Sequence, residues 1–210
     1  MIHSTKLWAT PFFTGQITPE TNDSARDSVL AIQAAEHAGN WLSPDDLHLR
    51  PEFAELCLEI REFVNAGLDL LTVVRDDILI TCMWANVAPV GYVHMEHIHH
   101  NSQYSGVVYL QAPPGSAGTF FRDPRPAAQM FCPDYHSPSN EIIGMDLQVL
   151  PAAAKICMWP SWLAHGVAAV PMDLTQRRIT LSYNIMLRAE STKPTTRLDT
   201  RHLWSWKSPN

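Results

Sequence analysis

The amino-acid sequence predicts a single α+β domain in which two helices precede a β-sandwich or an open barrel. Two helical stretches lie in the first part of the chain, and eight or nine short β-rich runs follow them. The chain has 210 residues, of which 46% are hydrophobic and 17% are charged. A chain of this length buries a full core without disulfide or metal cross-links. Short strands in a row after two helices are typical of an α+β domain.

The first part of the chain is predicted to hold an extended start and two helices. The run Leu7–Ile17 combines aromatic and β-branched residues with a proline and a glycine, which suits an edge strand. Proline opens the predicted helix Pro19–Glu36. A second helix is expected after Pro51, with Gly67 at its end, because its apolar residues recur at helical spacing.

The rest of the chain changes to short runs of strand composition, separated by Pro, Gly, Asp and Asn. The predicted strands are Leu70–Val74, Ile78–Val87, Tyr92–His99, Ser105–Gln111, Thr119–Arg122, Leu147–Leu150, Lys155–Trp159, Gly166–Val170 and Ile179–Leu187. The expected organisation is one domain over 1–210, with the extended start and helices in about 1–69 and the β-core in about 70–187. A proline-rich stretch at 123–144 is expected to be a long loop, and 188–210 a polar C-terminal tail.

Charge and cysteine usage exclude several classes of protein. The chain has 15 Lys and Arg against 21 Asp and Glu, a formal net charge of −6, which argues against a nucleic-acid or anionic-membrane binder. It shows no secretory signal and no apolar run long enough to cross a membrane. Its cysteines lie far apart, as is usual for reduced thiols, so we expect a cytoplasmic protein: Cys57, Cys82, Cys132 and Cys157.

Four of the ten histidines fall within seven residues, at 94, 97, 99 and 100. On a strand, alternate side chains share a face, so His97 and His99 are expected to point the same way and to be able to chelate one divalent ion. His94, Glu96 and His100 would then lie on the opposite face. The pair of His94 and Glu96 is therefore a competing metal chelate.

A second group of polar residues lies further along the chain. His165 stands at the start of an apolar run, 66 residues beyond His99. Thirteen residues later, Arg178, Thr180 and Ser182 alternate with apolar residues and should share one strand face. An arginine on a strand, flanked by hydroxyl groups, requires a carboxylate or phosphate partner, supplied either by an internal acid or by a ligand.

Taken in order, these segments resemble a known family. They resemble the double-stranded β-helix oxygenases that use Fe(II) and 2-oxoglutarate, and within them a 2-oxoglutarate–Fe(II) oxygenase family with the pattern H-x-H-x-x-S-x-x-SGV-x-Y. The similarity covers about residues 70–187 and implies a jelly-roll or cupin-like core with the N-terminal helices packed on one sheet. The segments that carry it are Trp84–Asn86, His97–Leu110, Gly118–Arg125, Pro160–Val167 and Arg178–Asn184.

The resemblance also implies roles for residues. It places His97, His99 and His165 as the ligands of Fe(II), and Arg178 as the partner of the distal carboxylate of 2-oxoglutarate. Further cosubstrate contacts are implied for four residues: Asn86, Tyr109, Thr180 and Ser182. The implied reaction uses O2, converts 2-oxoglutarate to succinate and CO2, and hydroxylates or otherwise oxidises a small molecule. A homodimer is one candidate assembly.

The sequence departs from most such oxygenases at one ligand. His99 stands where Asp or Glu is usual, and a third imidazole leaves the iron one positive charge higher. Asp123, or His94 with Glu96, could supply a carboxylate instead. The alternative function is a cupin-type dioxygenase in which three histidines hold the metal and 2-oxoglutarate takes no part. A domain without catalytic activity, in which the histidines hold a structural metal or form a pH-sensing patch, is the third interpretation.

Overall fold

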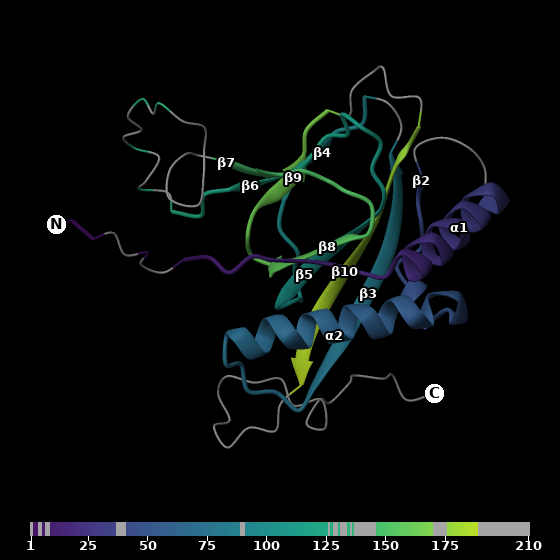
Figure 1. Cartoon of the computed structure of the whole chain (residues 1–210), viewed down its shortest axis with the longest axis horizontal. Helices are drawn as coiled ribbons and strands as arrows, with labels where there is room; N and C mark the ends of the chain where they lie inside the picture. The colour runs from purple at the N-terminus through teal and green to yellow at the C-terminus, as the bar shows by residue number, and fades with distance from the viewer. Residues whose placement is uncertain are drawn as a thin grey trace, which may run out of the picture.

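Two antiparallel sheets face each other in the computed structural model of this chain, and two helices cover the outer face of the larger sheet (Figure 1). The structure describes residues 9–36, 41–88, 91–125, 146–169 and 176–188, together with isolated positions 2, 3, 6, 127, 130, 134 and 136. The predicted tail 188–210, apart from residue 188, and most of the predicted loop 123–144 lie outside the described residues. No helix in the described part is long and apolar enough to cross a membrane.

The larger sheet has six strands in the order β1-β8-β5-β10-β3-β2. Its long central strand β10 pairs antiparallel with β3 on one side and with β5 on the other. The strands are β1 (Phe13–Gln16), β2 (Trp41–Leu42), β3 (Asp77–Ala88), β5 (Tyr104–Gln111), β8 (Lys155–Pro160) and β10 (Arg178–Arg188).

The smaller sheet has four strands in the order β4-β9-β6-β7. The strands are β4 (His94–His97), β6 (Thr119–Arg122), β7 (Asp146–Val149) and β9 (His165–Val167). The chain passes repeatedly between the two sheets, so residues that are distant in the sequence meet in the space between them.

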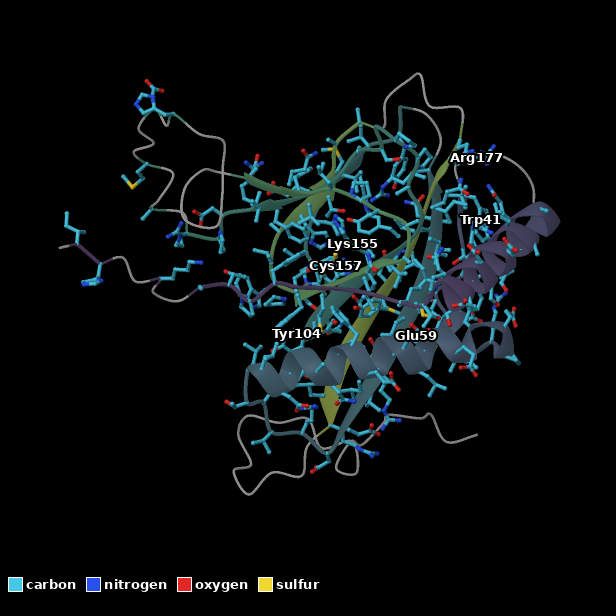
Figure 2. All side chains as sticks on the ribbon, in the orientation of Figure 1. Trp41, Glu59, Tyr104, Lys155, Cys157 and Arg177 are labelled. Carbon is cyan, nitrogen blue, oxygen red and sulfur yellow. The ribbon has the colours of Figure 1, made fainter. Side chains whose placement is uncertain are left out.

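The first helix, α1 (Pro19–Glu36), has the predicted bounds. Thr18 precedes the N-terminal proline, and its hydroxyl accepts a hydrogen bond from the backbone N–H of Thr21 at 3.3 Å, as an N-cap does. Both the N–H and the hydroxyl of Thr18 donate to the carboxylate of Glu59 on the second helix, at 2.8 and 2.7 Å. Figure 2 labels Glu59 on this helix. The two helices are therefore joined at the start of α1.

The second helix, α2 (Ala54–Leu70), follows two short 3-10 turns, η1 (Leu47–Leu49) and η2 (Pro51–Phe53). The prediction that Gly67 ends this helix is wrong. Gly67 lies inside α2, where a Cβ atom would stand 2.7 Å from the terminal methyl of Met158 on β8. The glycine allows the helix to pack closely on the sheet.

The main core lies between the helices and the larger sheet (Figure 1). The buried stripe of α2 meets the outward-facing residues of the central strands. This core includes Leu56, Ile60, Val64, Leu68, Met83, Ala85, Val87, Val108, Leu110, Ile156, Met158, Ile179, Leu181, Tyr183 and Ile185. The opposite residues of the same strands face the smaller sheet, and a second cluster lies there: Val107, Tyr109, Phe121, Cys157, Trp159 and Leu163.

Four predicted strands differ clearly from the observed elements. Gly166–Val170 is observed as His165–Val167. Leu70–Val74 is not a strand, because α2 continues to Leu70 and a turn follows, in which Thr72 has a positive φ of 53°. The first strand is limited to Phe13–Gln16, although it does lie at the sheet edge. The predicted strand Tyr92–His99 shortens to His94–His97. Local composition indicated extended chain in each case, but backbone pairing limits the strands.

Candidate active site

A β-bulge in β4 brings His94 and His97 to the same face. His94 pairs with Val167 and His97 with His165, so β4 uses three steps where β9 uses two. The rings of His94 and His97 stack with centroids 4.2 Å apart. The expectation that His94 lies opposite to His97 and His99 is therefore wrong, because the extra residue changes the alternation of side chains.

A turn after β4 positions His99. Asn101 adopts a left-handed conformation with φ of 54°, which asparagine tolerates better than most residues, and the chain then enters β5. The backbone N–H of His99 donates to the carbonyl of Ser161, at 3.0 Å. His99 is thus held against the end of β8, on the side of the cavity where His165 begins β9.

The three histidines predicted as metal ligands lie together. One ring nitrogen of each of His97, His99 and His165 falls within 4.8 Å of the others. The Nε2 atoms of His99 and His165 are 3.2 Å apart. Two ligands bound at a right angle, each about 2.1 Å from one ion, are separated by about 3.0 Å. The spacing therefore fits neighbouring ligands of a single ion.

Backbone carbonyls orient two of these rings. Nδ1 of His97 donates to the carbonyl of Met95, and Nδ1 of His165 donates to the carbonyl of Leu163, both at 2.8 Å. Because a carbonyl only accepts, the proton of each neutral ring is on Nδ1, and Nε2 keeps its lone pair. Metal-binding histidines in proteins are oriented by such second hydrogen bonds.

Burial keeps the imidazoles of His99 and His165 neutral. Desolvation, with the nearby histidines as a further cause, lowers the pKa of His99 to about 4 and that of His165 to about 3. His165 lies against the rings of Phe121 and Trp159, at centroid distances of 5.7 and 4.8 Å. A neutral imidazole with a free lone pair is the form that binds a metal.

Arg178 is a buried cation on the same side of the larger sheet. Its side chain is 2% exposed, and its Nε has no hydrogen-bond partner. Its guanidinium carbon lies 5.3 Å from the centroid of the Tyr109 ring. No carboxylate of the described residues forms an ion pair with it. An anion would supply the partner that this buried guanidinium lacks.

One cavity connects the histidines with Arg178. It is lined from β10 by Arg178, Thr180 and Ser182, as the alternation of the sequence predicts. The three histidines line the same cavity, as do His94, Trp84 and Asn86. Tyr109 is not part of the lining. It lies beneath Arg178, and its hydroxyl is 2.8 Å from that of Thr119, which does line the cavity.

The two acidic alternatives lie elsewhere. The carboxylate of Asp123 is bound by Arg125 at 2.6 Å. Glu96 forms an ion pair with Arg122 at 2.9 Å on the exposed side of the smaller sheet. Neither carboxylate belongs to the metal-competent group formed by the described residues.

A buried hydroxyl network behind His99 was not expected from the sequence. The hydroxyl of Ser161 lies 2.9 Å from that of Ser102 and 2.8 Å from that of Ser105, and Ser105 reaches Oδ1 of Asn184 at 2.8 Å. These residues connect the loop after β4 with β5, β8 and β10. Their spacing in the S-x-x-SGV and PSW segments is the signal that could have indicated them.

Comparisons with known proteins agree with this geometry. Residues 82–184 match the family model described as "Putative 2OG-Fe(II) oxygenase". A search of curated protein sequences finds no significant match. Among solved structures, the chain is similar to the non-heme alpha ketoglutarate dependent epimerase SnoN from nogalamycin biosynthesis, with a TM-score of 0.62, 12% identity, and coverage of 91% of this chain and 88% of that one.

Two further structures share the arrangement. A prolyl-4-hydroxylase from Pseudomonas putida has a TM-score of 0.58 and 12% identity, over 83% of this chain and 92% of that one. HygX from Streptomyces hygroscopicus, solved with nickel, 2-oxoglutarate and hygromycin B bound, has a TM-score of 0.56 and 14% identity, over 90% and 91%. These similarities confirm the double-stranded β-helix that was expected, with helices on one sheet.

Proposed function

Since this chain belongs to the 2-oxoglutarate- and Fe(II)-dependent oxygenases, we propose that His97, His99 and His165 hold its iron and that Arg178 holds its cosubstrate. The single observation that carries the proposal is the meeting of two groups in one cavity: three converging imidazoles and one buried arginine without an acidic partner. The three imidazoles lack a metal ion, and Arg178 lacks a carboxylate. Iron with bound 2-oxoglutarate would supply both.

The donor set fits Fe(II). Neutral imidazoles are suitable ligands for Zn, Cu, Fe and Ni, and a three-ligand cluster leaves coordination positions for further ligands. The carbonyls of Met95 and Leu163 fix the rings of His97 and His165 before the metal arrives, so little ordering is required on binding. The backbone N–H of His99 donates to the carbonyl of Ser161, and the hydroxyl of Ser161 belongs to the buried hydroxyl network. The network therefore helps to fix the position of His99.

Arg178 fits a carboxylate. Its unpartnered Nε points to a missing acceptor, and the planar guanidinium binds carboxylates in two-point geometry. The Tyr109 ring lies beneath the guanidinium and limits where it can move. Thr180 and Ser182 offer hydroxyl groups along the same strand face, toward the histidines. Arg178 would therefore orient 2-oxoglutarate by its distal carboxylate, with the other end toward His97, His99 and His165.

Iron and 2-oxoglutarate would supply the oxidative chemistry of the 2-oxoglutarate- and Fe(II)-dependent oxygenases. When bound, Fe(II) and 2-oxoglutarate activate O2, convert the 2-oxoglutarate to succinate and CO2, and oxidise a substrate held beside the metal. The protein binds and orients the reactants, and its aromatic residues Phe121 and Trp159 shield the imidazole of His165 from water. We infer a small-molecule substrate, because the cavity lies between the two sheets. We infer a cytoplasmic location, because Cys57, Cys82 and Cys157 are free thiols.

The third imidazole, in place of a carboxylate, is the observation that favours a second candidate function. A cupin-type dioxygenase with three histidines would use Arg178 for a carboxylate of its own substrate, and it would release no succinate. Anaerobic protein with Fe(II) and 2-oxoglutarate should develop the weak visible charge-transfer band of the chelated cosubstrate. On exposure to O2 it should form succinate in step with oxygen uptake, whereas the cupin-type enzyme should form none.

The variant Arg178→Ala tests the cosubstrate site directly. Loss of the charged contact should weaken 2-oxoglutarate binding by about 10- to 100-fold, measured by titrating the charge-transfer band. Metal binding should be retained, since Arg178 contributes no metal ligand. The variant Arg125→Ala is the matched control, because that arginine is exposed and bound to Asp123. Equal affinity of Arg178→Ala and the unsubstituted protein for 2-oxoglutarate would overturn the assignment.

A further inference from the structure

A second cavity opens beside the histidines, away from Arg178. Its volume is about 370 Å³, at the small end of the range for small-molecule sites. It shares Trp84, Asn86 and the imidazoles of His94, His97 and His99 with the first cavity, whereas Leu42 and Tyr92 line only the second. Arg178, Thr180 and Ser182 line only the first. A molecule in this second cavity would thus lie next to the metal ligands without occupying the cosubstrate position.

The walls of this cavity are made of five rings, one aliphatic side chain and the amide of Asn86. Trp84 lies beside His99 with ring centroids 5.6 Å apart, and Tyr92 lies beside His94 at 6.1 Å. Leu42, on the edge strand β2, forms the rim. None of the described lining residues is a carboxylate. Arg178 and a bound metal are both positive, so a cationic ligand would enter without a counter-charge.

One polar atom in this cavity lacks a partner. The side chain of Asn86 is 8% exposed; its Nδ2 donates to the hydroxyl of Tyr92 at 3.0 Å, and its Oδ1 has no hydrogen bond. Its backbone is fixed inside the sheet, opposite Leu42 on β2 and Thr180 on β10. A buried amide oxygen without a partner is unfavourable, so a ligand that donates a hydrogen bond there is stabilised.

The hydrogen-bonding character of Asn86 Oδ1 also determines which ligand groups can bind to it. This oxygen only accepts, and both ends of 2-oxoglutarate are carboxylates, which also only accept. A cosubstrate contact of Asn86 would have to use the second N–H of its Nδ2, since the first is bound to Tyr92, whereas Oδ1 is the atom without a partner. A neutral hydroxyl or N–H group of a substrate is the suitable partner.

We propose, on the basis of the function proposed above, that the second cavity binds the substrate and selects an uncharged, ring-bearing molecule whose O–H or N–H group donates to Oδ1 of Asn86. The rings of Trp84, Tyr92 and His94 contact the apolar body of the molecule. The donor group fixes its rotation beside the metal, so that one position of the molecule faces the reaction centre.

Three probes of equal skeleton test this selectivity: indane, 2-indanol, and 2-aminoindane, which is an ammonium ion at neutral pH. Their affinities are measured by ligand-observed NMR on the full chain loaded with Zn(II), which replaces iron so that nothing is oxidised, and with 2-oxoglutarate. We expect 2-indanol to bind about 3- to 10-fold more tightly than indane, and 2-aminoindane to bind most weakly. Equal affinity for indane and 2-indanol, or strongest binding of 2-aminoindane, would overturn the proposal.

The variant Asn86→Leu should remove the preference for 2-indanol over indane while leaving the affinity for indane unchanged. Met95→Leu is the matched control, since Met95 is 76% exposed on β4 and does not line the cavity. 2-Oxoglutarate is titrated into the same samples. Absence of 2-oxoglutarate binding counts against the proposed function, whereas normal 2-oxoglutarate binding with an equal response to the three probes counts against the substrate site alone. If Asn86→Leu does not fold, the ranking of probes by the unsubstituted protein still decides.

Discussion

The Nε2 atoms of His99 and His165 lie 3.2 Å apart, although 66 residues separate them in the sequence. Two lone pairs at this distance repel each other unless a proton or a metal ion lies between them. Because the proton of His165 is on Nδ1, Nε2 of His99 donates to Nε2 of His165 in the metal-free protein. With the proposed metal bound, both nitrogens would be its ligands, and this repulsion would be relieved.

The first prediction follows from this contact and concerns thermal stability. A divalent metal such as Ni(II) or Zn(II) at about 100 times its dissociation constant should stabilise the fold by about 2.7 kcal/mol, which raises Tm by about 5–10 °C for a domain of this size. Differential scanning fluorimetry measures the shift. His99→Ala should abolish it, whereas His100→Ala, an exposed neighbour, should retain it. A shift that survives in His99→Ala would exclude His99 as a ligand.

The second prediction concerns the charge of the third ligand. In His99→Glu, a carboxylate replaces a neutral imidazole, so the net charge of the metal centre falls by one. The variant should bind the metal more tightly and 2-oxoglutarate, a dianion, about tenfold more weakly. Calorimetric titration of each ligand separates the two effects. An equal loss of affinity for the metal and for 2-oxoglutarate would indicate that the substitution disturbs the geometry of the site rather than its charge. The variant His99→Gln provides the uncharged comparison.

The third prediction separates function from stability at Arg178. Because this buried guanidinium has no acidic partner among the described residues, its replacement by methionine should raise the free energy of unfolding of the ligand-free protein by about 1–2 kcal/mol. Urea unfolding measures this change. The same variant should lose 2-oxoglutarate binding. A decrease in stability would mean that the protein itself compensates the charge, and that the arginine is a structural residue.

The fourth prediction concerns Gly106, in the SGV segment. A Cβ atom at this position would overlap the ring and the hydroxyl of Tyr183, whose hydroxyl donates to the carbonyl of Cys157 at 2.9 Å. Gly106→Ala should destabilise the fold by about 3 kcal/mol. Tyr183→Phe, which keeps the ring and loses only the hydrogen bond, should cost about 1 kcal/mol. Both values come from chemical denaturation, and equal costs would show that the ring does not require the glycine.

Several parts of the fold could be predicted from the sequence, because they depend on residues that are close together along the chain. The proline at the start of α1 and the helical spacing in α2 predicted both helices. The alternation of Arg178, Thr180 and Ser182 with apolar residues predicted which side of β10 faces the cavity, since successive side chains of a strand point to opposite faces. The end of α2 could not be predicted from the sequence. Gly67 is required by its close contact with Met158 on β8, which is distant in the sequence, and not by the end of the helix.

The sequence by itself determined the residue types of the site and their order: an H-x-H pair, a later histidine and an arginine on a strand. Only the tertiary structure decided which histidines converge. The bulge in β4 places His94 beside His97, and this follows from pairing with β9, which no local pattern encodes. The free oxygen of Asn86 and the unpartnered Arg178 are likewise tertiary facts. Whether a buried polar group is satisfied depends on every element packed around it, and not on its own segment of chain.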